Sequence, residues 1–283
     1  ALGQTKVLYD GTYGVVPSSF GATYYNPADY TQNWTHFGGS TAHNPSVPVQ
    51  MPYMDGSVLH SDTTTSYDNW WGLTSVYDGP GGNTMNQSTG YTLRFDVGLV
   101  AENHNPNRDD NNDGVADRAG FSIIHVSSDG QYGLELAFWE DEIWAYEGGG
   151  VHGAGNATNY ANGLFCHAEG VAHDVTAGID RYDLCVKDGW YALYINDSDT
   201  YSLHGQLRDY TAFEASGFAP DPYDNSNDIF VSDNTTSASS HFLWSYMSIT
   251  QGATKAVPEP FTGGLLALGG WFLLGKRRRK AQG

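Results

Sequence analysis

The sequence predicts an all-β fold, a two-layer sandwich that occupies residues 1–250. Apolar and polar residues alternate with a period of two wherever a period can be read, which is the pattern of half-buried strands. The chain also contains 35 Gly for turns and 19 Tyr, 12 Phe and 8 Trp, aromatic residues that favour strands. No linker or internal repeat divides the body, so we expect one domain, and its length favours jelly-roll topology.

The strands are expected in the following order. A long strand begins the clear pattern, two hairpins with Asp-Gly turns follow, and a final strand precedes the C-terminal region. These elements are Tyr91–Glu102; Phe121–Ser127 with Gly133–Trp139; Tyr182–Val186 with Tyr191–Ile195; and His241–Thr250. The final strand carries apolar side chains at both odd and even positions, which predicts that both of its faces are covered.

The C-terminal region has the layout of a cell-envelope sorting tail. The motif Pro258-Glu259-Pro260 lies in an expected linker at 251–260, an uncharged stretch follows at 261–275, and a basic tail occupies 276–283. The uncharged stretch is shorter than the ~20 residues that span a bilayer comfortably. The cations after it favour the cytoplasmic side. The pattern predicts a transient transmembrane anchor with the body outside; an ordinary single-pass anchor is the alternative.

This tail resembles the PEP-CTERM signal of Gram-negative biofilm bacteria. The resemblance covers about a tenth of the chain. It implies that the protein is exported, is held in the inner membrane before processing, and is cut near the Pro-Glu-Pro motif by an exosortase-type protease. A location at the cell surface or in the extracellular matrix is therefore expected. The first residues, Ala1-Leu2-Gly3, also fit a processed secretory product.

Charge and cysteine content agree with an exported body. Residues 1–275 carry 8 Lys and Arg against 32 Asp and Glu, a formal net charge of −24. Such an acidic surface disfavours nucleic acid and anionic lipid and favours solubility or divalent cations. In an oxidising compartment, Cys166 and Cys185 are predicted to form one disulfide; free buried thiols are the alternative.

A calcium loop is predicted between the first strand and the first hairpin. Side-chain oxygens recur at alternate positions, Asp109, Asn111 and Asp113, and a Gly follows at the sixth position, as in the front half of an EF-hand loop. The carbonyl of Val115 and the carboxylate of Asp117 complete the predicted ligand set. Gly120 stands where an EF-hand has a bidentate Glu, so the loop is closer to thrombospondin-type or dockerin-like loops. A solvated turn is the alternative.

A second constellation combines carboxylates with aromatic rings. It consists of Trp139, Glu140, Glu142, Trp144 and Tyr146. Laminarinase-like hydrolases carry Glu-x-Asp-x-Glu on one strand, and the match here is imperfect because Asp141 points away from the face that Glu140 and Glu142 share. We interpret the group as a carbohydrate-binding surface of stacked rings; an acidic strand end with packed Trp residues is the alternative.

The body also resembles known modules. From Leu93 onward, the order of strands resembles concanavalin A-like and laminin-G-like modules. Five segments resemble a choice-of-anchor module that recurs in PEP-CTERM proteins. They are Asp117–Phe121, Glu135–Trp144, His167–Gly170, Leu207–Tyr210 and Asp233–Ser237. The resemblance implies a fold and a location but no reaction. We therefore predict a non-enzymatic, calcium-stabilised surface or matrix protein that binds exopolysaccharide or copies of itself; the alternative is a polysaccharide-active hydrolase or lyase on the same fold.

Overall fold

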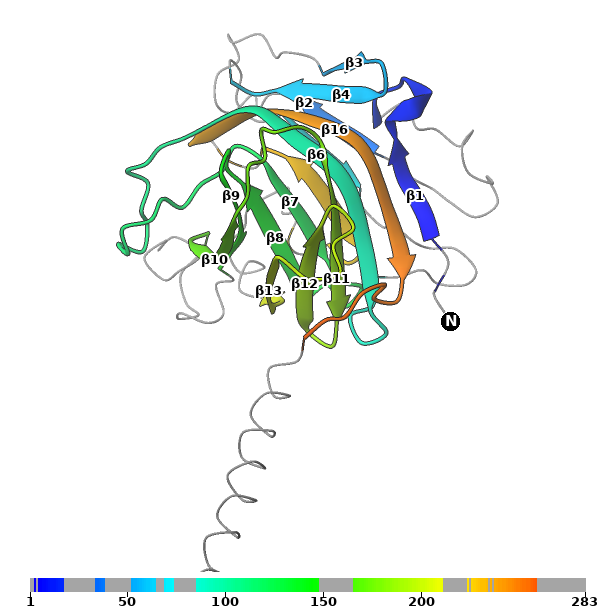
Figure 1. The fold of residues 1–283 in the computed structure, drawn as a ribbon. Helices are drawn as coiled ribbons and strands as arrows, with labels where there is room; N and C mark the ends of the chain where they lie inside the picture. Colours follow the sequence, from blue (N-terminus) through cyan, green and yellow to red (C-terminus); the bar gives the residue numbers. More distant parts are fainter. Residues whose placement is uncertain are drawn as a thin grey trace, which may run out of the picture.

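The structure, a computed structural model, is a sandwich of two antiparallel β-sheets (Figure 1). It describes residues 3, 5–17, 34–38, 52–64, 69–73, 85–147, 165–210, 223, 225–233, 235 and 237–258. Within these residues the helical structure consists of 3₁₀ turns, such as Gly11–Tyr13, and no helix has the length and apolarity needed to cross a bilayer. The predicted transmembrane segment 261–275 and basic tail 276–283 lie outside the described residues. The all-β prediction is confirmed.

Among the described residues each sheet has eight strands, which are given below in spatial order. Sheet A contains β13 (Leu203–Gln206), β12 (Trp190–Ile195), β11 (Asp180–Lys187), β6 (Tyr91–His104), β16 (Ala238–Gln251), β4 (Val58–Asp62) and β3 (Tyr53–Asp55), with β1 (Thr5–Asp10) beside β16. Sheet B contains β10 (His167–Ala172), β9 (Glu142–Tyr146), β8 (Tyr132–Phe138), β7 (Ser122–Val126), β15 (Asp228–Ser232), β5 (Asn69–Leu73) and β2 (Trp34–Gly38), with β14 (Arg208–Asp209) beside β8.

Both predicted hairpins are confirmed. In the first, β7 pairs with β8 from Ser122 opposite Ala137 to Val126 opposite Gly133. In the second, β11 pairs with β12, and Asp188 and Gly189 link them with φ of 51° and 80°. Positive φ at both central residues gives a turn whose twist matches that of the strands. These turns place every second residue of four strands in the core.

The last strand carries apolar side chains of both parities, and Leu243 and Tyr246, which are not part of the core between the sheets, are half-buried. The register of β16 against β6 shifts between Trp244 and Tyr246, which marks a β-bulge. Because of this shift, Phe242 and Trp244 before the bulge and Met247 and Ile249 after it all join the core between the sheets. Apolar residues of both parities therefore lie on one face.

One edge of the sandwich is closed by side chains from both sheets. Glu169 of β10 accepts a hydrogen bond of 2.7 Å from the hydroxyl of Tyr191 of β12, and its other oxygen lies 2.6 Å from the guanidinium of Arg208. A Cβ added to Gly205 of β13 would lie 1.9 Å from the Glu169 carboxylate, so a larger residue here would displace this carboxylate from its partners. The close approach joins the edge strands β10 and β13.

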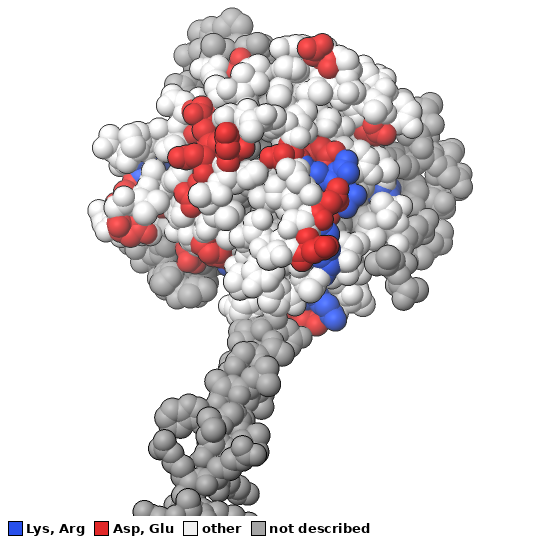
Figure 2. Space-filling model, in the orientation of Figure 1, with Lys and Arg blue, Asp and Glu red and all other residues white. Residues whose placement is uncertain are grey.

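Residues 251–258 are not a free linker in the structure. Gln251 is the last residue of β16, and Ala253 and Val257 after it pack on the outer face of sheet A. Basic and acidic side chains alternate on the same face, where Arg94 pairs with Asp183 and Arg181 pairs with Asp96. Figure 2 shows Lys and Arg next to Asp and Glu in a band on this side of the molecule.

Candidate functional site

The predicted calcium loop folds around its own side-chain oxygens. The two oxygens of Asp109 accept the backbone N–H groups of Asp113 at 3.1 Å and Gly114 at 2.9 Å. Asn111 and Asp113 each accept the N–H group two residues ahead, at 3.1 Å and 2.8 Å. Gly114 has φ of +92°, a conformation that favours glycine. The loop therefore has the alternating order of oxygens that the sequence predicts.

Asp117 does not fit the predicted ligand set. Its side chain is buried, and one oxygen accepts the N–H of Asp110 while the other accepts the N–H of His167 at 2.7 Å. Asp117 thus joins the loop to the start of β10. Among the described residues, no three His, Cys, Asp or Glu side chains are placed to hold one metal ion. The predicted set is thus reduced to the side-chain oxygens of Asp109, Asn111 and Asp113 and the carbonyl of Val115.

The aromatic part of the predicted carbohydrate surface is buried. Trp139 is 8% exposed, Trp144 is 0% exposed and Tyr146 is 5% exposed. The three rings form one cluster on the outer face of sheet B with Ala119 and Ala137. We call residues 109–117 the Asp/Asn loop. The segment after this loop covers the rings, since Trp139 Nε1 donates a hydrogen bond of 2.8 Å to the carbonyl of Arg118 in that segment. The prediction that these rings stack on a sugar is wrong.

The two carboxylates of the same constellation do not converge. Glu140 lies in the turn after β8 and accepts the backbone N–H of Glu102 at 3.2 Å. Glu142 begins β9, and its carboxylate lies 3.3 Å from His167 Nε2. A glycosidase needs two carboxylates facing one glycosidic bond. The arrangement here favours structural roles for both groups.

Three tyrosines lie close to the buried carboxylate of Glu135 in β8. Tyr223 donates a 2.6 Å hydrogen bond to Glu135, and Tyr146 and Tyr210 are buried nearby. Burial, with the negative charge of Glu135 in addition, raises the pKa of all three tyrosines well above its ordinary value. Their hydroxyls therefore stay protonated near neutral pH. The three tyrosines and Glu135 thus form a buried polar cluster.

Two buried arginines, Arg118 and Arg208, join separate segments of the chain. Arg208 donates 2.8 Å to the carbonyl of Tyr146. Arg118 donates to the Asp110 carboxylate at 2.6 Å and to the carbonyl of Phe165. Each guanidinium is buried and holds a carboxylate together with backbone carbonyls, an arrangement that satisfies a buried charge. Arg118 thus joins Asp110 to the segment before β10, and Arg208 joins β14 to the end of β9.

The predicted disulfide between Cys166 and Cys185 is wrong. Both cysteines are free and buried, and they belong to different sheets. Cys185 packs on the outer face of sheet A with Ala192 and Tyr194. Cys166 precedes β10 of sheet B, where burial and the neighbouring Asp117 carboxylate raise the pKa of its thiol to about 12. A thiol with this pKa is unreactive at neutral pH.

An exposed aromatic group that the sequence analysis missed lies on the outer face of sheet A. Tyr53 of β3 is 46% exposed, and its ring stacks on His60 of β4 with centroids 4.7 Å apart. His60 Nδ1 in turn lies 3.0 Å from Nε2 of His241 on β16. The dipeptide Asp55-Gly56 was the available signal, because Asp-Gly between apolar residues predicts a hairpin.

Comparison with known proteins gives likeness of fold only. No protein-family model and no curated protein matches the chain. Among solved structures, the exoplasmic/lumenal domain of VIP36 in its Ca2+/Man3GlcNAc-bound form is 9% identical, with 90% of this chain and 93% of that chain covered and a TM-score of 0.44. Alginate lyase A1-II′ is 11% identical, with coverages of 82% and 98% and a TM-score of 0.40. The receptor binding domain of botulinum neurotoxin D is 11% identical, with coverages of 79% and 45% and a TM-score of 0.38.

Proposed function

We propose that this protein is an exported, non-enzymatic cell-surface or biofilm-matrix component with a jelly-roll, lectin-like sandwich that binds extracellular polysaccharide. Its PEP-CTERM-like tail holds it in the inner membrane until an exosortase-type protease acts. The acidic body, with a formal net charge of −24 before residue 276, fits an extracellular setting. The observation that carries the binding role is the exposed ring of Tyr53, stacked on His60.

The group around Tyr53 has the chemistry that sugar recognition requires. An aromatic ring offers a flat apolar surface to the C–H face of a sugar, while neighbouring polar groups bond to its hydroxyls. Here His60, His241 and the exposed Asp55 provide such groups next to the ring. The hairpin of β3 and β4 also ends the order of sheet A among the described strands. Pairing of copies along that edge is the second form of the proposal.

Substitution of Tyr53 should weaken polysaccharide binding. For Tyr53→Ala we expect about a tenfold loss of affinity, since a stacked ring contributes about 1.4 kcal/mol. The measurement is co-sedimentation of the full chain with insoluble neutral and acidic polysaccharides. Tyr13→Ala, which removes another exposed ring, is the control and should bind normally. Equal binding by both variants would contradict this site, and concentration-dependent oligomers that Tyr53→Ala abolishes would favour self-assembly.

Calcium at the Asp/Asn loop is part of the proposal. Asp109, Asn111, Asp113 and the Val115 carbonyl would hold the ion, and water would complete the six to eight oxygens that calcium prefers. Millimolar calcium should raise the melting temperature of the full chain, because a ligand that binds only the folded state stabilises it. Asp113→Ala should remove the rise. No rise in the unsubstituted protein would reduce the loop to a turn held by its own hydrogen bonds.

A further inference from the structure

The chain leaves β16 and crosses back over sheet A. We call Gly252–Pro258 the stem. Its first residue donates a backbone hydrogen bond of 2.9 Å to the carbonyl of Gly90. The hydroxyl of Thr92 donates 3.2 Å to the carbonyl of Gly252 and accepts the N–H of Thr254 at 2.8 Å. Thr92 thus fixes two successive parts of the stem to β6.

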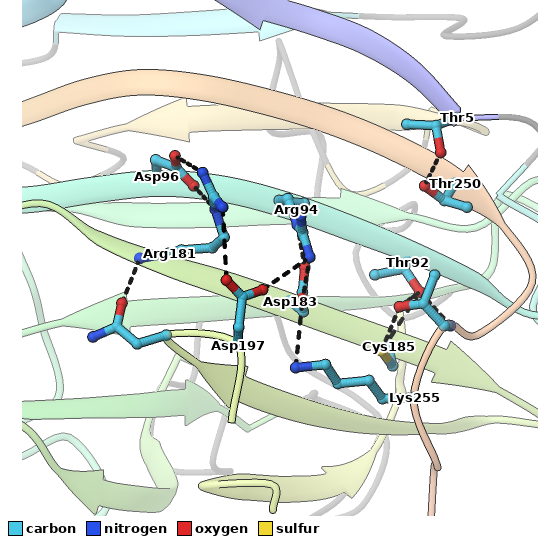
Figure 3. Close-up of polar contacts among 12 residues, drawn as sticks. Thr5, Thr92, Arg94, Asp96, Arg181, Asp183, Cys185, Asp197, Thr250 and Lys255 are labelled. Carbon is cyan, nitrogen blue, oxygen red and sulfur yellow. Dashed lines mark hydrogen bonds and ion pairs between the residues drawn. The ribbon is translucent and has the colours of Figure 1, made fainter. Parts of the chain in front are cut away.

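A charged side chain fastens the middle of the stem. Lys255 Nζ donates 2.7 Å to the carbonyl of Ser198, lies 3.6 Å from the carboxylate of Asp183, and sits 4.9 Å from the centre of the Tyr194 ring. Asp183 is buried and also forms a bidentate pair with Arg94. Figure 3 shows Lys255 extended along the sheet toward Asp183. An ion pair with one buried partner is screened less than a pair on the open surface.

Apolar contacts hold the remaining residues. Ala253 and Val257 pack on the cluster of Cys185, Ala192 and Tyr194. The hydroxyl of Tyr194 donates to the carbonyl of Ala256. Backbone, charged and apolar contacts therefore act along the stem from Gly252 to Val257. They are made to three strands, β6, β11 and β12, and to the loop that follows β12.

We propose that the outer face of β6, β11 and β12 is a docking surface for the chain's own C-terminal segment. The docked stem sets the boundary at which proteolysis of the tail stops, and it makes the tail leave the body from one fixed place. The last stem contact among the described residues is that of Val257, directly before Pro258-Glu259-Pro260, so a protease that cuts at or after this motif leaves these contacts on sheet A. The link to tail removal rests on the proposed function; the docking itself does not.

Limited trypsin digestion of the full chain in detergent tests the docking. Between Lys255 and Lys276 the sequence has no Lys or Arg, so cleavage at the two places gives bodies that mass spectrometry separates clearly. We expect rapid cleavage at 276–280 and cleavage after Lys255 that is at least about tenfold slower, because a docked bond must open before a protease can cut it.

Matched variants complete the test. Tyr194→Phe with Val257→Ser should accelerate cleavage after Lys255 at least about tenfold by removing one hydrogen bond and one apolar contact. Ala256→Ser, at an exposed side chain next to the cut bond, should leave the rate unchanged. Cleavage after Lys187 reports unfolding of the sandwich and should not change. Fast cleavage after Lys255 in the unsubstituted chain, or equal rates in both variants, would overturn the proposal. These rates do not depend on polysaccharide, calcium or a sorting protease. The docking of the stem is therefore tested independently of the proposed function.

Discussion

Acidification should destabilise the sandwich steeply below pH 6.5, and His125 should be responsible. The imidazole is fully buried in β7, where its Nδ1 shares a 2.8 Å hydrogen bond with the hydroxyl of Tyr91. Burial lowers the pKa of His125 to about 3. The ring therefore stays neutral in the folded protein while it takes up a proton near pH 6.5 in the unfolded chain. The contribution of neutral His125 to the free energy of unfolding is fully present above pH 6.5. It falls by about 1.4 kcal/mol per pH unit toward pH 3, about 5 kcal/mol in all.

Urea unfolding at several pH values between 7.5 and 4 measures this effect. His125→Gln keeps a polar side chain next to Tyr91 but cannot take up the proton. The slope of its free energy of unfolding against pH should therefore be smaller by about 1.4 kcal/mol per pH unit, the contribution of one proton. The exposed His204→Gln is the matched control and should keep the full slope. His104 acts in the opposite direction, because its hydrogen bond to Glu102 raises the pKa of His104. An unchanged slope in His125→Gln would refute the assignment.

Loss of the Asp117 carboxylate should destabilise the protein by about 3 kcal/mol, since two partly buried backbone N–H groups lose their acceptor. These donors belong to Asp110 and His167, so the Asp/Asn loop and the start of β10 would separate. Urea unfolding of Asp117→Ala with a chelator present measures the loss without any contribution from calcium.

Asp113→Ala is the control for this measurement. Asp113 is exposed and its carboxylate accepts one backbone N–H of the loop, that of Val115. We expect its substitution to cost less than about 1 kcal/mol, as is usual for a surface position. Equal losses for Asp113→Ala and Asp117→Ala would show that Asp117 does not have the structural role assigned to it.

Local signals in the sequence were sufficient for the hairpins. A dipeptide such as Asp188-Gly189 determines its own turn, because its residues tolerate positive φ, and the strands on either side then pair in register. The last strand shows the limit of this reasoning. The bulge at Ser245 changes which parity faces the core, and a period of two cannot reveal an extra residue in one strand.

The site could be predicted only in part for a related reason. The sequence groups Trp139 and Trp144 with carboxylates as a binding surface, but it contains no information about a segment that packs on these rings. The distance between Cys166 and Cys185 likewise depends on which sheet each segment joins. Asp117 has the spacing of a calcium ligand. Its carboxylate instead accepts the backbone N–H of His167, which lies 50 residues later in the sequence.

The way in which the stem continues β16 determines how the protein responds to mechanical force. A pull on the tail first loads the stem contacts and then reaches Gln251, the last residue of β16. This strand is hydrogen-bonded to β6 from Ala238 to Gln251 and is flanked on its other side by β1 and β4. Tension along the strand therefore loads many hydrogen bonds at once. We expect a tethered molecule to release its stem well before its sandwich yields, so that the stem contacts absorb the first extension.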